Sequence, residues 1–85
     1  MVPTVHLNGT SRKQLEVQLE EVGLAIQSAI RALGTAAPNG RDYYPQGPLA
    51  INRAVVDHLS RLEKLQDVYD DIMMIYEGVV DQNQR

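Results

Sequence analysis

The chain has 85 residues, of which 44% are apolar, and it contains no cysteine, tryptophan or phenylalanine. A domain of this size buries only about 60% of the surface of its unfolded chain, and the absence of cysteine excludes disulfides and thiolate metal sites. The formal net charge of −3 argues against a general nucleic-acid binder. No apolar run approaches the roughly 20 residues of a membrane span and no secretory signal opens the chain, so we expect one soluble, intracellular domain over residues 1–85.

Residues 1–10 are expected to form an extended arm that ends in an Asn-Gly turn and is able to add a strand to a neighbour. Ser11 and Gln14 then have the spacing of a capping box, with Thr10 as a second candidate cap. A helix is therefore predicted over residues 11–36.

The apolar residues of this first helix step by four and three, which is the spacing of a heptad seam. They are Leu15, Leu19, Val22, Ile26, Ala29 and Leu33. Gly23 costs about 1 kcal/mol relative to alanine within a helix, and it either admits a close neighbour or is merely tolerated. Pro38 cannot continue the helix, and Asn39 with Gly40 is expected to supply a left-handed conformation at its end.

A loop is predicted over residues 37–47, followed by a second helix over residues 48–80 that starts on Pro48. The polar tail, residues 81–85, is expected to fray. The seam of the second helix again alternates four and three, with one polar member, His58. Its members are Ile51, Val55, His58, Leu62, Leu65, Tyr69, Ile72, Tyr76 and Val79.

Two seams joined by a loop predict an all-α chain folded as an antiparallel two-helix hairpin. The second helix carries more apolar surface than one partner helix covers, including Val56, Leu59 and Val68. We therefore predict a homo-oligomeric helical bundle, a dimer or a higher assembly. The alternative is a third short helix in the loop that covers part of this surface.

The loop carries more chemistry than a simple connection requires. Arginine offers bidentate contacts to phosphate or carboxylate, and tyrosine offers a stacking face and a hydroxyl. We predict here a binding site for an anionic, nucleotide-like small molecule. Its core residues are Arg41, Tyr43 and Tyr44, assisted by Asn39, Gln46 and Arg53. The alternative is a structural loop in which the tyrosines cap the hairpin and the arginines pair with Asp42 or Asp57.

The turn before the first helix is a second candidate anion site, because a helix N-terminus offers free N–H groups. Its residues are Asn8, Thr10, Ser11 and Arg12, although ordinary capping is the alternative explanation. Residues 24–56 carry a net charge of +2 and residues 57–84 carry −5. In an antiparallel oligomer, the basic loop end of one subunit is able to lie against the acidic or N-terminal end of another. The alternative is a solvated acidic helix face.

The chain contains no HExxH, CxxC or Walker A motif and no Ser/His/Asp order, so we expect no enzyme, no cofactor and no metal site. One exception arises if residue i meets residue 84−i across the hairpin. Acids of the two helices would then gather as in all-α Mg²⁺-dependent nucleotide pyrophosphohydrolases, although the motifs of that family match only in part. These acids are Glu16, Glu20, Glu21, Asp67, Asp70 and Asp71.

Two stretches of the chain resemble a known family. They are His-Leu-Asn-Gly-Thr-Ser at residues 6–11 and Ala-Ala-Pro-Asn-Gly-Arg-Asp-Tyr-Tyr-Pro-Gln-Gly-Pro at residues 36–48. Together they resemble a family of small, uncharacterised proteins encoded by tailed bacteriophages, over nearly the whole chain. The resemblance implies a viral origin but no established activity, and we expect the protein in the host cytoplasm.

A second resemblance concerns architecture alone. Phage proteins that counter CBASS and Thoeris immunity include small helical-hairpin oligomers that act as sponges, sequestering cyclic oligonucleotides or cyclic ADP-ribose isomers without cleaving them. The similarity implies an anti-defence role in immune evasion. The alternatives are a protein-interaction inhibitor of a host defence complex, a phage structural or accessory protein, and the Mg²⁺ pyrophosphohydrolase above. Neither duplex nucleic acid nor a membrane is expected as a partner.

Overall fold

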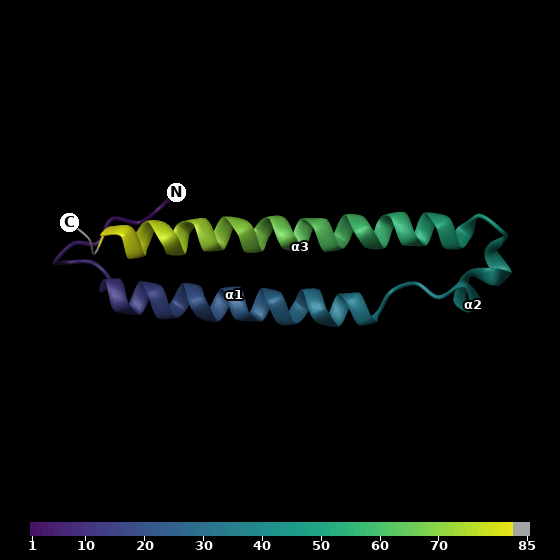
Figure 1. Cartoon of the computed structure of the whole chain (residues 1–85), viewed down its shortest axis with the longest axis horizontal. Coiled ribbons are helices and arrows are strands. Elements are labelled where there is room, and N and C mark those ends of the chain that lie inside the picture. The colour runs from purple at the N-terminus through teal and green to yellow at the C-terminus, as the bar shows by residue number, and fades with distance from the viewer. Residues whose placement is uncertain (83–85) are drawn as a thin grey trace.

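The computed structural model describes residues 1–82, which form three α-helices and one short 3-10 helix (Figure 1). These are α1 (Arg12–Thr35), α2 (Gly40–Tyr43), η1 (Tyr44–Gln46) and α3 (Ala50–Asp81). No strand occurs in this range, which confirms the all-α prediction. Within the same residues, no helix has both the length and the apolar character needed to cross a bilayer.

The two long helices, α1 and α3, lie side by side and run in opposite directions (Figure 1). The molecule is therefore a rod that measures 61 × 18 × 17 Å. We call the end that holds residues 36–61 the loop end. The opposite end, which holds residues 1–12 and 76–82, is the arm end.

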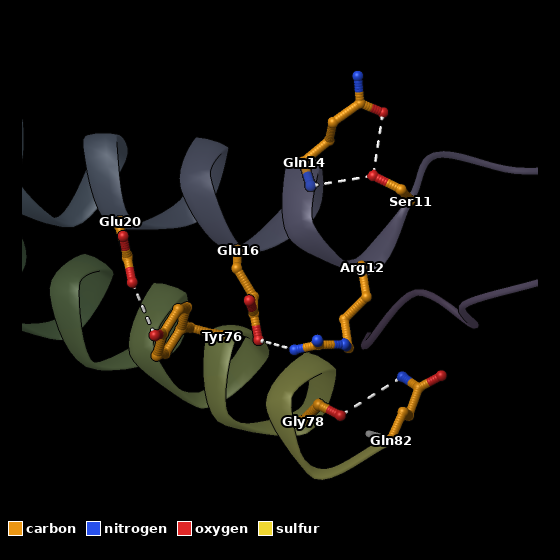
Figure 2. Close-up of polar contacts among 8 residues, drawn as sticks. All are labelled: Ser11, Arg12, Gln14, Glu16, Glu20, Tyr76, Gly78 and Gln82. Atoms are coloured by element: carbon orange, nitrogen blue, oxygen red, sulfur yellow. Dashed lines mark hydrogen bonds and ion pairs between the residues drawn. The ribbon is translucent and has the colours of Figure 1, made fainter.

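Ser11 is the N-cap of α1, as the sequence predicts. Its Oγ accepts a hydrogen bond from the Gln14 backbone N–H at 3.1 Å, and its hydroxyl donates to the Gln14 side-chain oxygen at 3.3 Å (Figure 2). The bond from the Gln14 N–H to the Ser11 Oγ satisfies one of the free N–H groups of the first helical turn. Thr10, the second candidate cap, is exposed and plays no part in it.

The end of α1 differs from the prediction. The helix is capped by Ala36, whose N–H donates to the Leu33 carbonyl at 3.1 Å. Asn39 has an extended backbone with φ of −110° and starts α2 instead of terminating α1. The left-handed conformation falls on Gly47, whose φ is +108°.

The start of α3 also differs from the prediction. The helix begins at Ala50 and not at Pro48, because a turn closed by the Ala50 N–H and the Gly47 carbonyl, 3.3 Å apart, comes first. The short helices α2 and η1 meanwhile fold the predicted loop into a turn at the tip of the rod (Figure 1). A third short helix therefore exists in the loop, as the alternative expected, but Val56, Leu59 and Val68 stay 50–66% exposed, so it does not cover them.

The two long helices pair about twelve residues away from the predicted register. The Gln27 side-chain amide donates to the Tyr69 hydroxyl at 2.9 Å, and the Tyr76 hydroxyl donates to a Glu20 carboxylate oxygen at 2.8 Å (Figure 2). In both pairs residue i meets residue 96−i, whereas 84−i was expected. The reason is the connection, residues 36–49, which runs beyond the end of α1 before it turns back. The first turns of α3 therefore lie opposite this connection and not opposite α1.

The new register separates the acids that were expected to gather. Glu20 meets Tyr76, and Glu16 pairs with Arg12 on its own helix at 2.6 Å (Figure 2). Among residues 1–82, no group of three or more histidine, aspartate or glutamate side chains is placed to hold a metal ion. The expected acidic cluster is thus wrong for this chain, because it depended on the 84−i register.

The best-packed part of the rod lies toward the arm end. Val79 is the one fully buried hydrophobic residue in the described range. Gly23 is buried against α3, where a Cβ would lie 3.2 Å from the Met73 sulfur. This glycine therefore admits a close neighbour, the first of the two roles considered from the sequence.

The N-terminal arm lies along the end of its own α3 (Figure 1). The Val5 N–H donates to the Gln82 side-chain oxygen at 2.8 Å, and the Gln82 amide nitrogen donates to the Pro3 carbonyl at 2.8 Å. The methyl groups of Val2 lie over Gly78, where an added Cβ would come within 2.7 Å of them. The Gln82 side-chain amide thus makes the hydrogen bonds to the arm that a neighbouring strand would make in a sheet.

Candidate functional site

A hollow of about 700 Å³ lies at the loop end, between the connection and the first turns of α3. Its volume is in the range of known small-molecule sites. The connection contributes Pro38, Tyr43 and Gln46, and α3 forms the facing wall. The space exists because α1 stops at Thr35, and because small residues such as Ala54 line α3 here.

His58 is the buried polar residue of this hollow. The side chain is 6% exposed, and its Nε2 has no hydrogen-bond partner among residues 1–82. Leaving a buried polar group without a partner costs about 1–3 kcal/mol, so such groups are rare in native proteins. Because Nε2 is closed off from solvent, a polar ligand in the hollow reaches it only when the side chains that cover it move.

Two arginines follow the same side of α3. Arg53 and Arg61 both line the hollow, with Asp57 between them, and the spacing of four residues places all three on one face of the helix. In the described part of the chain, neither arginine has a carboxylate oxygen within 4.0 Å. The ion pair found in this range joins Arg12 to Glu16. The lining therefore has a net positive charge and two guanidinium groups available for an anion.

The N-terminus of α3 adds to this positive potential. Leu49 occupies the N-cap position and offers no side-chain acceptor, so within residues 1–82 no side chain caps the helix there. A helix of 32 residues carries a partial positive charge at its N-terminus. Leu49 and Ala50 both line the hollow, so this end of the helix dipole faces the same space as the arginines.

The Tyr43 side chain lies between two hollows at the loop end. It is half-buried, and it lines both the main hollow and a second hollow of about 530 Å³. Tyr44 lines only the second hollow and is 84% exposed. The two adjacent tyrosines therefore present ring faces to different spaces.

The structure brings some of the predicted loop residues together and separates others. Tyr43, Gln46 and Arg53 line the main hollow, and Tyr44 lines its neighbour. Arg41 and Asn39 line neither hollow. The Asn39 side-chain oxygen accepts from the Arg41 backbone N–H at 2.9 Å and from the Arg41 Nε at 3.3 Å, which caps α2.

The four predicted residues of the first turn lie at the arm end, far along the rod from the hollow (Figure 1). They are Asn8, Thr10, Ser11 and Arg12. Ser11 caps α1 and Arg12 pairs with Glu16 (Figure 2). One chain by itself therefore does not bring this turn to the loop site.

The purely structural alternative for the loop is met only in part. Tyr43 packs against the end of the rod, but Tyr44 is exposed. Within residues 1–82, no loop arginine pairs with Asp42 or Asp57. The positive charge of this end is thus left for solvent or for a ligand.

Sequence reasoning missed His58 and Arg61 as members of the site. The signal for His58 was its position, the one polar residue of a nine-member apolar seam. Arg61 stands two helical turns after Arg53, which places both on one face. These two facts could have extended the predicted site from the loop onto the second helix.

Comparison with protein-family models, with curated proteins and with solved structures finds no match to this chain. The resemblance to a phage family therefore stays a prediction. The assignment of a function rests on the geometry of the site.

Proposed function

We propose that the protein is a non-catalytic binding protein whose loop-end hollow takes up a small anionic molecule with a planar ring, such as a nucleotide derivative. The observation that carries this proposal is the buried His58, whose Nε2 has no partner among residues 1–82, in the wall of a hollow that Arg53 and Arg61 also line. A buried polar atom without a partner is costly for folding, and a ligand that bonds it would offset that cost.

Each part of the hollow has a role in this proposal. Arg53 and Arg61 bind the anionic group, phosphate or carboxylate, through charge-assisted hydrogen bonds, and the uncapped start of α3 adds to the attraction. Tyr43 offers its ring as a stacking surface. The His58 Nε2 donates or accepts a hydrogen bond according to its tautomer, which selects a ligand with a matching polar atom.

The proposal extends to the biological setting that the phage resemblance implies. There the ligand is a nucleotide-derived signal of host immunity in the host cytoplasm, and sequestration without cleavage is the anti-defence activity. We also propose that α1 and α3 act as a hairpin that assembles with further copies into a helical bundle. The small core supports this assembly, because Val79 is its one fully buried hydrophobic residue in the described range.

Isothermal titration calorimetry tests the ligand. The panel consists of cyclic dinucleotides, NAD, ADP-ribose isomers and inorganic phosphate. We expect at least one nucleotide derivative to bind, and we expect R53Q and R61Q each to weaken it about tenfold, which corresponds to about 1.4 kcal/mol. The matched control is R31Q, an exposed arginine of α1 that lies outside the hollow.

Two outcomes would overturn the proposal. One is the absence of binding by every member of the panel. The other is binding that R53Q and R61Q weaken no more than R31Q does. If a host protein is captured instead, and the double variant R53Q/R61Q captures it equally well, the interaction-inhibitor alternative replaces the proposal.

A further inference from the structure

The α1–α3 pair has one side on which side-chain hydrogen bonds cross between the helices, which we call the polar side, and a second side on which no such bond occurs among residues 1–82. Gln27 and Glu20 reach across to the tyrosines of α3 on the polar side. At 100° per residue, Val22 lies about 160° around α1 from Glu20, on the other side of the contact with α3. Residues seven apart follow the same line along a helix, so this second side continues over both helices.

The apolar residues of the second side form what we call the apolar face, and the charged Lys64 and Asp71 stand beside it, one turn of α3 from Val68. The residues of the apolar face are Leu15, Val22, Ala29 and Leu33 from α1, and Val68 and Ile75 from α3. Leu33 lines the loop-end hollow together with Arg61, which stands seven residues before Val68. The row of residues that contains Leu33 on α1 and the row that contains Val68 on α3 therefore lie on the same side of the rod. Val22 is 42% exposed and Val68 is 50% exposed, so the single chain leaves this face partly wet.

The area of the molecule indicates how much surface is left to bury. Its accessible surface is 6570 Å². A compact monomer of 9.5 kDa is expected to expose roughly 5,000 Å². The surplus of roughly 1,500 Å² per chain is in the range that each subunit of an obligate homodimer buries, about 1,000–2,500 Å². One further copy of this chain is therefore enough to cover it.

The charges of the two halves decide the orientation of that copy. The half of the rod toward the loop end, residues 28–67, has five basic and four acidic side chains, a net charge of +1. The half toward the arm end, residues 1–27 and 68–82, has two basic and seven acidic side chains, a net charge of −5. Copies with their arm ends together would place the two acidic halves side by side, whereas copies in opposite directions place unlike halves together.

We propose that the apolar face packs against the same face of a second copy, with the loop end of each chain toward the arm end of the other. The two-fold axis crosses the rod at right angles, so α1 lies antiparallel against the partner's α1, and α3 lies against the partner's α3, in a four-helix bundle. This dimer rests on the helical bundle of copies proposed above, and it does not depend on the proposed ligand. Because Leu33 belongs to both the apolar face and the hollow, the interface ends at the edge of the ligand site.

The absence of cysteine makes disulfide trapping a direct test. Single variants L15C, V22C, A29C and I75C are mixed in pairs and oxidised mildly. We expect disulfide-linked dimers among the α1 variants, either between copies of one variant or between two of them. A bundle with both loop ends together places α1 against the partner's α3 and would link V22C to I75C instead. The control is L24C, which is 65% exposed on the other side of α1 and is expected to remain unlinked.

Sedimentation equilibrium provides the second measurement. We expect the wild-type chain to have twice the mass of one chain, and V22E and V68E each to shift the equilibrium toward single chains while the far-ultraviolet circular dichroism stays helical. A wild-type chain that sediments as a monomer would overturn the proposal. The same holds for a disulfide pattern dominated by V22C with I75C, or for linkage of L24C equal to that of the α1 variants.

Discussion

The two ends of the rod use their polar groups in opposite ways. At the arm end, Gln82 bonds the arm, Ser11 caps α1 and Tyr76 bonds Glu20. At the loop end, by contrast, His58 has no partner for Nε2 among the described residues, and α3 starts without a side-chain cap. The arm end uses its polar side chains for structure, whereas at the loop end Asn39 caps α2 but the polar side chains of the hollow keep no partner among the described residues. This contrast is typical of proteins that give up stability where they bind.

The largest expected effect tests whether the packing is concentrated at the arm end. V79A removes two buried methyl groups and should lower the free energy of unfolding by about 2 kcal/mol, from lost burial and the cavity that remains. The matched variant at the loop end is L49A, where the side chain is 74% exposed, and its effect should stay within about 0.5 kcal/mol. Urea unfolding followed by circular dichroism measures both. Equal losses would show that the two ends are packed alike.

The next effect tests whether the loop end gives up stability for binding. H58L replaces the buried orphan polar group with an apolar one, so the free energy of unfolding should rise by about 1–2 kcal/mol. The same change should abolish ligand binding. The control is H6L, because His6 is exposed at the arm end and its loss should change neither quantity by much. A less stable H58L protein would mean that His58 is there for packing.

A smaller effect tests the attachment of the arm. Q82A removes the two hydrogen bonds to Val5 and Pro3, so the arm should detach at a cost of about 1 kcal/mol. Amide hydrogen exchange at Val5 should accelerate while exchange within α1 stays slow. Q66A is the control, since Gln66 bonds only Asp70 on its own helix. Unchanged exchange at Val5 would show that the apolar contact of the arm is sufficient.

The smallest effect concerns pH. The hydrogen bond from its hydroxyl to Glu20 raises the pKa of Tyr76 above its usual value of 10.0. The folded state therefore holds this proton more tightly than the unfolded state. The stabilisation is fully present below about pH 10, and it is lost as the pH rises through the higher folded pKa.

The Y76F variant should remove this alkaline loss, so its unfolding free energy should depend less on pH above about pH 10. Y44F is the matched control, since Tyr44 is 84% exposed. Urea unfolding at several alkaline pH values compares the two variants with the wild type. A Y76F protein with the same alkaline slope as the wild type would contradict the role of the Glu20 bond.

Local sequence signals predicted the elements of this fold well. The Ser11 cap and the heptad spacing acted through the first helix itself, so α1 starts where expected. The prediction that α3 starts at Pro48 was wrong, because the preceding Gly47 adopts a positive φ that closes a turn first. The preference of proline for the first position of a helix takes no account of the backbone conformation of the residue before the proline.

The register and the site depend on information that is not local. The path of residues 36–49 shifts the pairing of the helices, and nothing in the seam spacing alone fixes that path. The same shift places His58 opposite the connection and not opposite α1, which leaves its Nε2 without a partner. The loop tyrosine and arginine chemistry was readable from sequence, whereas the contribution of α3 to the hollow required the register.

The bonds of Gln82 to the arm join residues that stand 77 and 79 positions apart in the chain. These contacts cannot form during synthesis until residue 82 itself has been made. The heptad pairs, in contrast, begin to meet as soon as the middle of α3 is available. Contacts between such distant positions are slow to form and add little to an early folding nucleus. The arm therefore docks late in folding, and Gly78, which the methyl groups of Val2 cover in the folded chain, stays uncovered until it does.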